Sequence, residues 1–229
     1  MFRKYEEEYN PKIDFKLIYS INSYLNINEN YKEIRNYFHH KTKVESRQAI
    51  MFKNLKEVFD SLKNIPVQKL TKLGVKEILR KLEIEDIKED NIDSFLTLLQ
   101  NEKNDEIPTF STKVFEFIFK NEMFTEMSIE IGLLFMNAIL YQNHYIPIVI
   151  FKNNFNFFKD IIKQNISTTS LVEIFSNLQD VSMRYKGKFE QTTKQNIVDG
   201  LVQNKWEMNQ RFQVEKLWLY GSFVRDDTT

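Results

Sequence analysis

The chain has 229 residues, 42% of them hydrophobic, which is enough to bury a large core. Its 32 basic and 32 acidic side chains balance, which excludes a general electrostatic attraction to nucleic acid or to an anionic membrane, although a local charged patch stays compatible with this balance. The chain contains no cysteine, so disulfides and thiolate metal sites are excluded.

The first half of the chain is predicted to be helical. It contains stretches in which apolar residues recur three or four positions apart, the spacing of an amphipathic helix. Pro66 interrupts this pattern, because proline cannot continue a helix. The whole chain has only five glycines and four prolines, which favours long helices and few tight turns. The predicted helical stretches are 11–24, 29–63 (one or two helices), 67–84 and 91–103.

The second half begins with the most apolar part of the chain. A helix is predicted over 126–142, with Leu133, Leu134, Leu140 and either Met136 or Asn137 turned inward along one apolar stripe. The short, β-branched segment 145–150, YIPIVI, is predicted to be extended. The other predicted elements are helices at 111–121, 153–164, 168–184 and 197–212, a polar linker at 186–196 and a strand at 214–220.

Two absences bear on where the protein acts. The N-terminus MFRKYEEEYNPKIDF is charged and has no apolar signal core, and no apolar run reaches the length of a membrane span. We therefore expect a cytoplasmic protein that does not associate with a membrane.

The segment 122–150 carries the most specific pattern. It contains LLFMNAIL at 133–140 and YIPIVI at 145–150. These sequences resemble the central segment of Fic-family proteins, which commonly transfer AMP from ATP to a protein hydroxyl. The resemblance extends over roughly 30–185 and implies an all-α, Fic-like helical domain.

The Fic signature is HxFx(D/E)GNGRxxR, and here it falls on EMFTEMSIE, residues 122–130. Phe124 keeps the aromatic position, and Glu126 matches the acidic position that binds magnesium in the family. Glu122 stands where the family has its catalytic histidine, Ser128 where it has asparagine and Glu130 where it has the first arginine. The resemblance therefore implies a Fic scaffold whose motif is degenerate.

The physical chemistry of these replacements argues against nucleotide binding. Met127 and Ile129 replace the two glycines that let backbone N–H groups approach phosphate oxygens. On a continuous helix, Glu122, Glu126 and Glu130 would share one face. At about 5 Å and an effective dielectric constant near 20, each carboxylate would repel a phosphate charge by roughly 3 kcal/mol.

These carboxylates are most simply interpreted as a solvated helix face. No histidine or cysteine lies nearby in the sequence, which argues against a new metal site, and Glu126 is the one candidate metal ligand. His39, His40 and His144 are predicted to be surface residues without metal-ligand spacing.

The C-terminal sequence VEKLWLYGSFVR resembles the first strand and GS turn of minimal nucleotidyltransferases of the polymerase-β type. The resemblance implies that Gly221, Ser222 and Arg225 would bind a triphosphate in a complete domain. The aspartate pair that holds magnesium in that family would lie beyond Thr229. We therefore expect a helical domain over 1–185 and, over 186–229, a short helix-plus-strand appendage that begins a nucleotidyltransferase domain.

These patterns lead to one main functional prediction and two alternatives. The main one is a Fic-like module, inactive in AMP transfer, that recognises or regulates a protein partner beside a nucleotidyltransferase domain. The first alternative is an active nucleotidyltransferase that transfers AMP or another nucleotide to a protein or nucleic-acid hydroxyl, with ATP and magnesium. It would be of the Fic type, with Glu122 as base and Glu126 as magnesium ligand, or of the polymerase-β type. The second is a structural helical module. We also expect self-association through the C-terminal strand.

Overall fold

The computed structural model describes residues 2–4, 12–24, 31–84, 89–101, 106–124, 127–164 and 166–184. The chain divides into two compact units, Met1–Arg184 and Tyr185–Thr229. The second unit, with the predicted helix, strand and GS turn, lies outside the described residues. The first unit is helical in its described part: α1 (Lys12–Tyr24), α2 (Tyr31–His40), α3 (Arg47–Asn64), the 3-10 helix η1 (Val67–Lys69), α4 (Lys72–Lys81), α5 (Glu89–Gln100), α6 (Ile107–Lys120), α7 (Ser128–Gln142), α8 (Lys152–Ile162) and α9 (Thr168–Arg184).

The helical prediction for this part of the chain is confirmed, with shifts at the helix ends. The stretch 29–63 forms two helices, and the stretch 67–84 begins with η1 before α4. Helix α6 starts four residues before the predicted 111, with Pro108 in its first turn. Proline is tolerated there because the first N–H groups of a helix have no partner within it. No helix among the described residues is both long and apolar enough to cross a membrane.

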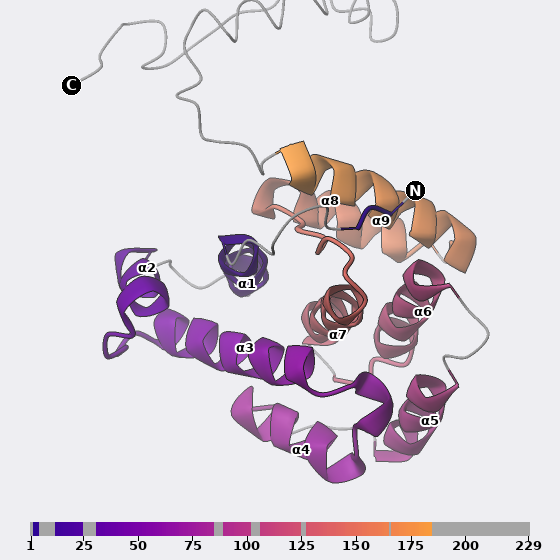
Figure 1. The fold of residues 1–229 in the computed structure, drawn as a ribbon, viewed down its shortest axis with the longest axis horizontal. Helices are drawn as coiled ribbons and strands as arrows, with labels where there is room; N and C mark the ends of the chain where they lie inside the picture. The colour runs from indigo at the N-terminus through magenta and orange to yellow at the C-terminus, as the bar shows by residue number, and fades with distance from the viewer. Residues whose placement is uncertain are drawn as a thin grey trace, which may run out of the picture. The chain divides into compact units, whose positions relative to one another are not determined.

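Helix α7 lies at the centre of the unit, with α1, α3, α6 and α8 around it (Figure 1). Every residue from Ser128 to Leu140 is buried. The predicted inward residues, Leu133, Leu134, Met136, Asn137 and Leu140, are each at most 1% exposed. The predicted residues are buried, but burial is not limited to one apolar stripe, because the helix is apolar on all sides and is covered on all sides.

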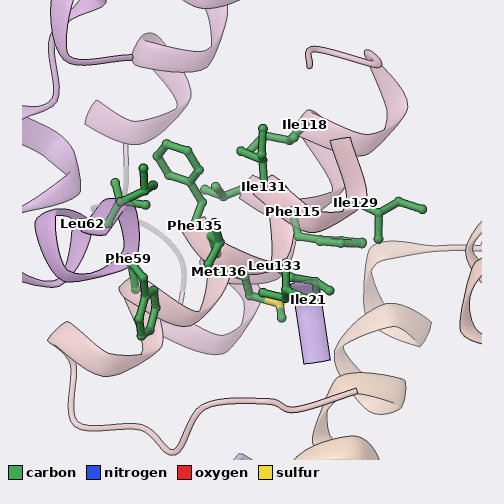
Figure 2. Close-up of a cluster of buried hydrophobic side chains, with 14 of the residues drawn as sticks. Ile21, Phe59, Leu62, Phe115, Ile118, Ile129, Ile131, Leu133, Phe135 and Met136 are labelled. Atoms are coloured by element: carbon green, nitrogen blue, oxygen red, sulfur yellow. The ribbon is translucent and has the colours of Figure 1, made fainter. Parts of the chain in front are cut away.

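The core around α7 is rich in aromatic rings (Figure 2). Phe115 of α6 is fully buried and packs edge-on against Phe175, with ring centroids 5.1 Å apart. The same ring presses on α7, since a Cβ atom added at Gly132 would lie 2.9 Å from the Phe115 ring. Glycine at this position therefore allows the close approach of α6 and α7.

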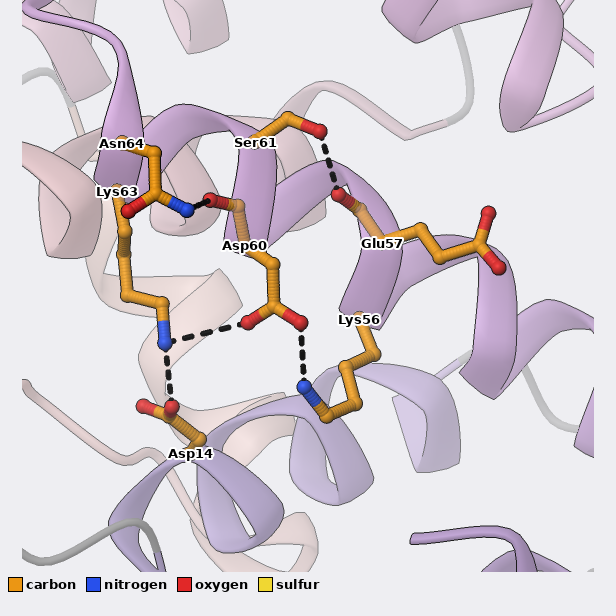
Figure 3. Close-up of polar contacts among 7 residues, drawn as sticks. All are labelled: Asp14, Lys56, Glu57, Asp60, Ser61, Lys63 and Asn64. Atoms are coloured by element: carbon orange, nitrogen blue, oxygen red, sulfur yellow. Dashed lines mark hydrogen bonds and ion pairs between the residues drawn. The ribbon is translucent and has the colours of Figure 1, made fainter. Parts of the chain in front are cut away.

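A network of charged side chains joins α1 to α3 (Figure 3). The Lys63 ammonium lies 2.5 Å from a carboxylate oxygen of Asp14 and 3.2 Å from one of Asp60. Lys56 binds the other oxygen of Asp60 at 2.5 Å. Burial disfavours the charge on Lys63, but the two carboxylates outweigh burial and raise its pKa. The ammonium is thus held charged between the two helices.

The segment 145–150 contains no helix, as predicted, and it is held by side-chain amides. The Asn137 amide of α7 donates to the Ile148 carbonyl at 3.2 Å and accepts from the Ile148 N–H at 2.6 Å. Gln179 of α9 donates to the Ile146 carbonyl at 2.5 Å and accepts from the Arg3 N–H at 2.6 Å. The segment is therefore fixed to α7 and to the N-terminal residues.

Candidate functional site: the junction of α6 and α7

The junction between α6 and α7 carries the residues that align with the Fic signature. Helix α6 ends at Lys120, residues 121–124 form a turn, and α7 starts at Ser128. Glu122 is exposed in this turn, with φ of 44°, in the left-handed region. Its backbone N–H donates to the Phe119 carbonyl at 3.1 Å. Glu122 thus belongs to the end of α6 and not to α7.

Phe124 and Ser128 are brought together inside the protein. Phe124 is 1% exposed and Ser128 is 5% exposed. The Phe124 N–H donates to the Ser128 hydroxyl at 3.1 Å. This bond fixes the end of the turn to the start of α7 and uses the serine hydroxyl as an acceptor.

Glu130 is a buried carboxyl group in the first turn of α7, with 6% of its surface exposed. Burial raises the pKa of Glu130, although its own backbone N–H and the positive charge of Lys159 act in the opposite direction. The N-terminal end of a helix also favours a carboxylate, because the helix dipole is positive there. Burial nevertheless prevails, so the group holds its proton more firmly than a carboxyl in water.

The predicted face of carboxylates does not form. Glu122 is exposed, as expected, but it lies in the turn and not on a helix face. Glu130 is buried, so the interpretation as a solvated residue is wrong for Glu130. Glu126 lies outside the described residues. The turn interrupts the helix at 121–124, which breaks the spacing that would have aligned the side chains.

The surroundings of Glu130 include residues that the sequence patterns did not indicate. Tyr24 at the end of α1 stacks on Phe155 of α8, with ring centroids 3.5 Å apart and planes 4° apart. Burial, and after it the charge of Glu130, raise the pKa of Tyr24 far above its ordinary value. Only the fold brings these groups near α7, so no local signal could have revealed them.

The first turn of α7 is therefore poorly suited to bind a phosphate. Ile129 is 9% exposed and Met127 packs against the core, so both positions carry bulky side chains where an anion nest needs free backbone N–H groups. The titratable side chain in this turn is an acid, Glu130, and not a base. Whether protonated or ionised, it supplies no positive charge for a phosphate.

Replacing Glu130 by glutamine should make stability less dependent on pH. The pKa of Glu130 is raised in the folded state, so the folded state binds more protons than the unfolded state as pH rises through this range. Its contribution to stability is full below the unfolded pKa of about 4.3 and is lost as pH rises through the folded pKa. We expect the difference in unfolding free energy between Glu130→Gln and wild type to become more favourable to the variant from about pH 4 to pH 8.

The measurement is urea denaturation at several pH values. Glu77→Gln is the matched control, because Glu77 is an exposed glutamate on α4 and is in water in both states. Tyr24, whose pKa is raised by burial and by the charge of Glu130, keeps its proton throughout this pH range. A free-energy difference that stays constant over the range would contradict the raised pKa.

The described residues contain no group of three or more histidine, cysteine, aspartate or glutamate side chains that could hold a metal ion. His39 and His40 lie at the end of α2 and His144 lies in the turn after α7, all exposed, as predicted. Gly221, Ser222 and Arg225 lie outside the described residues.

The described part of the chain is mostly helical, and in it a central, enclosed helix is followed by a segment without helix. A solved structure of a Fic domain-containing signaling protein from Bacteroides thetaiotaomicron is similar to this chain, with a TM-score of 0.64 and 14% sequence identity. The match covers 76% of this chain and 85% of that chain, so the fold is Fic-like. No protein-family model matches the sequence, and no curated protein matches it.

Proposed function

We propose that residues 1–185 form a Fic-like module that does not transfer AMP and that recognises or regulates a protein partner. The likeness to a Fic domain-containing signaling protein supports the scaffold. The observation that carries the loss of chemistry is the buried carboxyl of Glu130 in the first turn of α7, at the position of the family's first arginine.

Three further features of the junction support this proposal. Glu122, at the position of the catalytic histidine, is exposed in a turn while Glu130 is buried. The Ser128 hydroxyl accepts the Phe124 N–H and is buried with it. The side chain of Ile129 is buried at one of the two glycine positions. An anionic nucleotide would contact the large side chain of Ile129 where the family has glycine, and the carboxyl group of Glu130 where the family has arginine.

The second part of the proposal concerns the C-terminal unit. We propose that 186–229 belongs to a nucleotidyltransferase domain, in which Gly221, Ser222 and Arg225 would bind a triphosphate. The support for this is the sequence VEKLWLYGSFVR. ATP and magnesium would be ligands of this second domain only under the alternative of an active nucleotidyltransferase.

The test is incubation of the full chain with magnesium and ATP that carries a label on its α-phosphate. We expect no labelled protein, because the base, the phosphate nest and the arginines of the signature are all replaced. ATP with magnesium should also leave the melting temperature of the helical unit unchanged, since a ligand that binds only the folded state raises it.

Three variants make this test specific. Labelling that is lost in Glu122→Gln but kept in Glu83→Gln would overturn the proposal and establish Glu122 as a base. Glu83 is a matched control, because it is also an exposed glutamate with positive φ, 58° against 44° for Glu122. Labelling that is lost only in Ser222→Ala would belong to the C-terminal unit and would leave the inactive Fic-like module in place.

A further inference from the structure

One face of α2 gathers exposed polar and aromatic side chains into two rows. Positions four apart in a helix lie on one side, so 31, 35 and 39 form the first row and 32, 36 and 40 the second. All six are exposed, and together they line a surface hollow of about 550 Å³. We call this surface the α2 face: Tyr31, Lys32, Arg35, Asn36, His39 and His40.

The α2 face carries positive charge that the described part of the protein does not neutralise. Lys32 and Arg35 are exposed, and neither forms an ion pair within the described residues. The one acidic residue of α2, Glu33, accepts hydrogen bonds from the backbone N–H groups of Glu45 and Ser46 at 2.5 and 3.1 Å, and it keeps its negative charge, because hydrogen bonds from Ser46 and Glu45 lower its pKa. The cations of this surface, Lys32, Arg35 and Lys43, outnumber the carboxylates of Glu33 and Glu45 by one. This local charge stands out in a chain whose net charge is zero.

A second hollow continues the positive surface. It measures about 350 Å³ and is lined by Lys32, Asn36, Thr42 and Lys43, with Glu33. Lys32 and Asn36 line both hollows, so the two form adjoining parts of one surface. Lys43 pairs with Glu45, but both side chains are more than 70% exposed, and a pair so exposed is readily exchanged for another partner.

Aromatic rings lie among these cations. Tyr31 is 47% exposed, although its ring is held at right angles to Tyr19, with centroids 5.4 Å apart, and near Phe15 at 6.3 Å. A ring that is fixed by its neighbours and still reached by solvent loses little freedom when a flat ligand stacks on it. The exposed imidazoles of His39 and His40 add further flat surfaces at the other end of the helix.

We propose that the α2 face binds a short segment of single-stranded nucleic acid. The cations of Lys32, Arg35 and Lys43 contact phosphate oxygens, and the Arg35 guanidinium can donate two parallel hydrogen bonds to one phosphate. An unpaired base stacks on Tyr31, and the Asn36 amide, in the second row, forms hydrogen bonds with the strand. A ten-residue helix is about 15 Å long, which matches a segment of a few nucleotides.

The combination of rings and cations favours this ligand over an acidic protein segment. Carboxylates need only the positive charge, whereas bases also use exposed aromatic faces. A single strand is favoured over a duplex because the faces of its bases are free to stack on a side chain. With three cations on the surface, the logarithm of the binding constant should fall with the logarithm of salt concentration at a slope of about −2.

The experiment measures fluorescence anisotropy of a labelled oligothymidylate of about twelve nucleotides, titrated with the full chain at low salt. We expect Lys32→Glu/Arg35→Glu to weaken binding by at least about tenfold, because two attractions become repulsions. Tyr31→Ala should weaken binding about five- to tenfold, whereas Tyr31→Phe, which keeps a ring, should bind like wild type. Thermal unfolding of each variant confirms that it is folded.

The matched control is Lys69→Glu/Arg80→Glu, which changes the net charge equally with two exposed residues on η1 and α4. It should bind the oligonucleotide like wild type. Equal losses in the two double variants would show a response to net charge alone and would overturn the proposal. So would the absence of binding, or binding of a DNA duplex of equal length as tightly as the single strand. Poly-glutamate that competes fully, with no effect of Tyr31→Ala, would assign the surface to an acidic partner instead.

Discussion

Replacing Asn137 by leucine should lower the free energy of unfolding by about 2–5 kcal/mol, because a buried hydrogen-bonding group left unpaired costs about 1–3 kcal/mol. Leucine has a similar size, so the change removes hydrogen bonds and leaves little cavity. The Asn137 amide bonds both the N–H and the carbonyl of Ile148, and also the Leu133 carbonyl at 2.9 Å. Both Asn137 and Ile148 are fully buried, so water cannot replace the lost partner.

The measurement is guanidinium denaturation, together with hydrogen exchange of the Ile148 amide, which should lose its protection. Asn143→Ala is the control on the same helix: the Asn143 amide donates to the Ile139 carbonyl at 3.0 Å, within its own helix end, and is only partly buried. We expect that control to cost less than about 1 kcal/mol. If Asn137→Leu lowered the free energy of unfolding by no more than Asn143→Ala does, the Asn137 amide would not be what holds the extended segment.

Truncating Leu140 to alanine should cost about 2–5 kcal/mol, through the lost transfer of its side chain from water and the cavity left behind. Leu140 is fully buried near the end of α7. The helix is enclosed on all sides, so its neighbours can close the cavity only partly.

Leu73→Ala provides the matched control, since Leu73 on α4 is 76% exposed. It should change stability by no more than about 0.5 kcal/mol. The two variants are compared with wild type by their urea midpoints, provided that the slope of unfolding free energy against urea concentration is unchanged. If Leu140→Ala falls within the error of wild type, that residue is on the surface, and the alignment of 133–150 with the Fic pattern fails.

The helices could be predicted because their signal is local. Apolar residues repeat at helical spacing in α3 and α4, and β-branched residues around Pro147 mark an extended segment. The enclosure of α7 was not predicted. A helix buried along one stripe and a helix covered on all sides differ only in whether other helices also pack on the remaining faces. That depends on how α1, α3, α6 and α8 pack around it, which the sequence of α7 does not contain.

The candidate site was harder to predict, for two physical reasons. The turn at 121–124 places Glu122 in left-handed backbone, and no glycine or proline in that stretch announces the turn. Glu130 is buried, and the charge of Glu130 acts on Tyr24 of α1, which no spacing in the sequence reveals. The alignment therefore located the junction, whereas the environment of each side chain came from tertiary contacts.

The enclosure of α7 also affects whether the protein unfolds reversibly when it is heated. Once the surrounding helices open, the segment SIEIGLLFMNAIL is exposed to other chains, and it contains one charged residue in a long apolar run. Such a segment associates with its copies faster than it refolds at high protein concentration. The lifetime of the folded chain is then governed by the rate at which its outer helices separate from α7, and not by the equilibrium between folded and unfolded states.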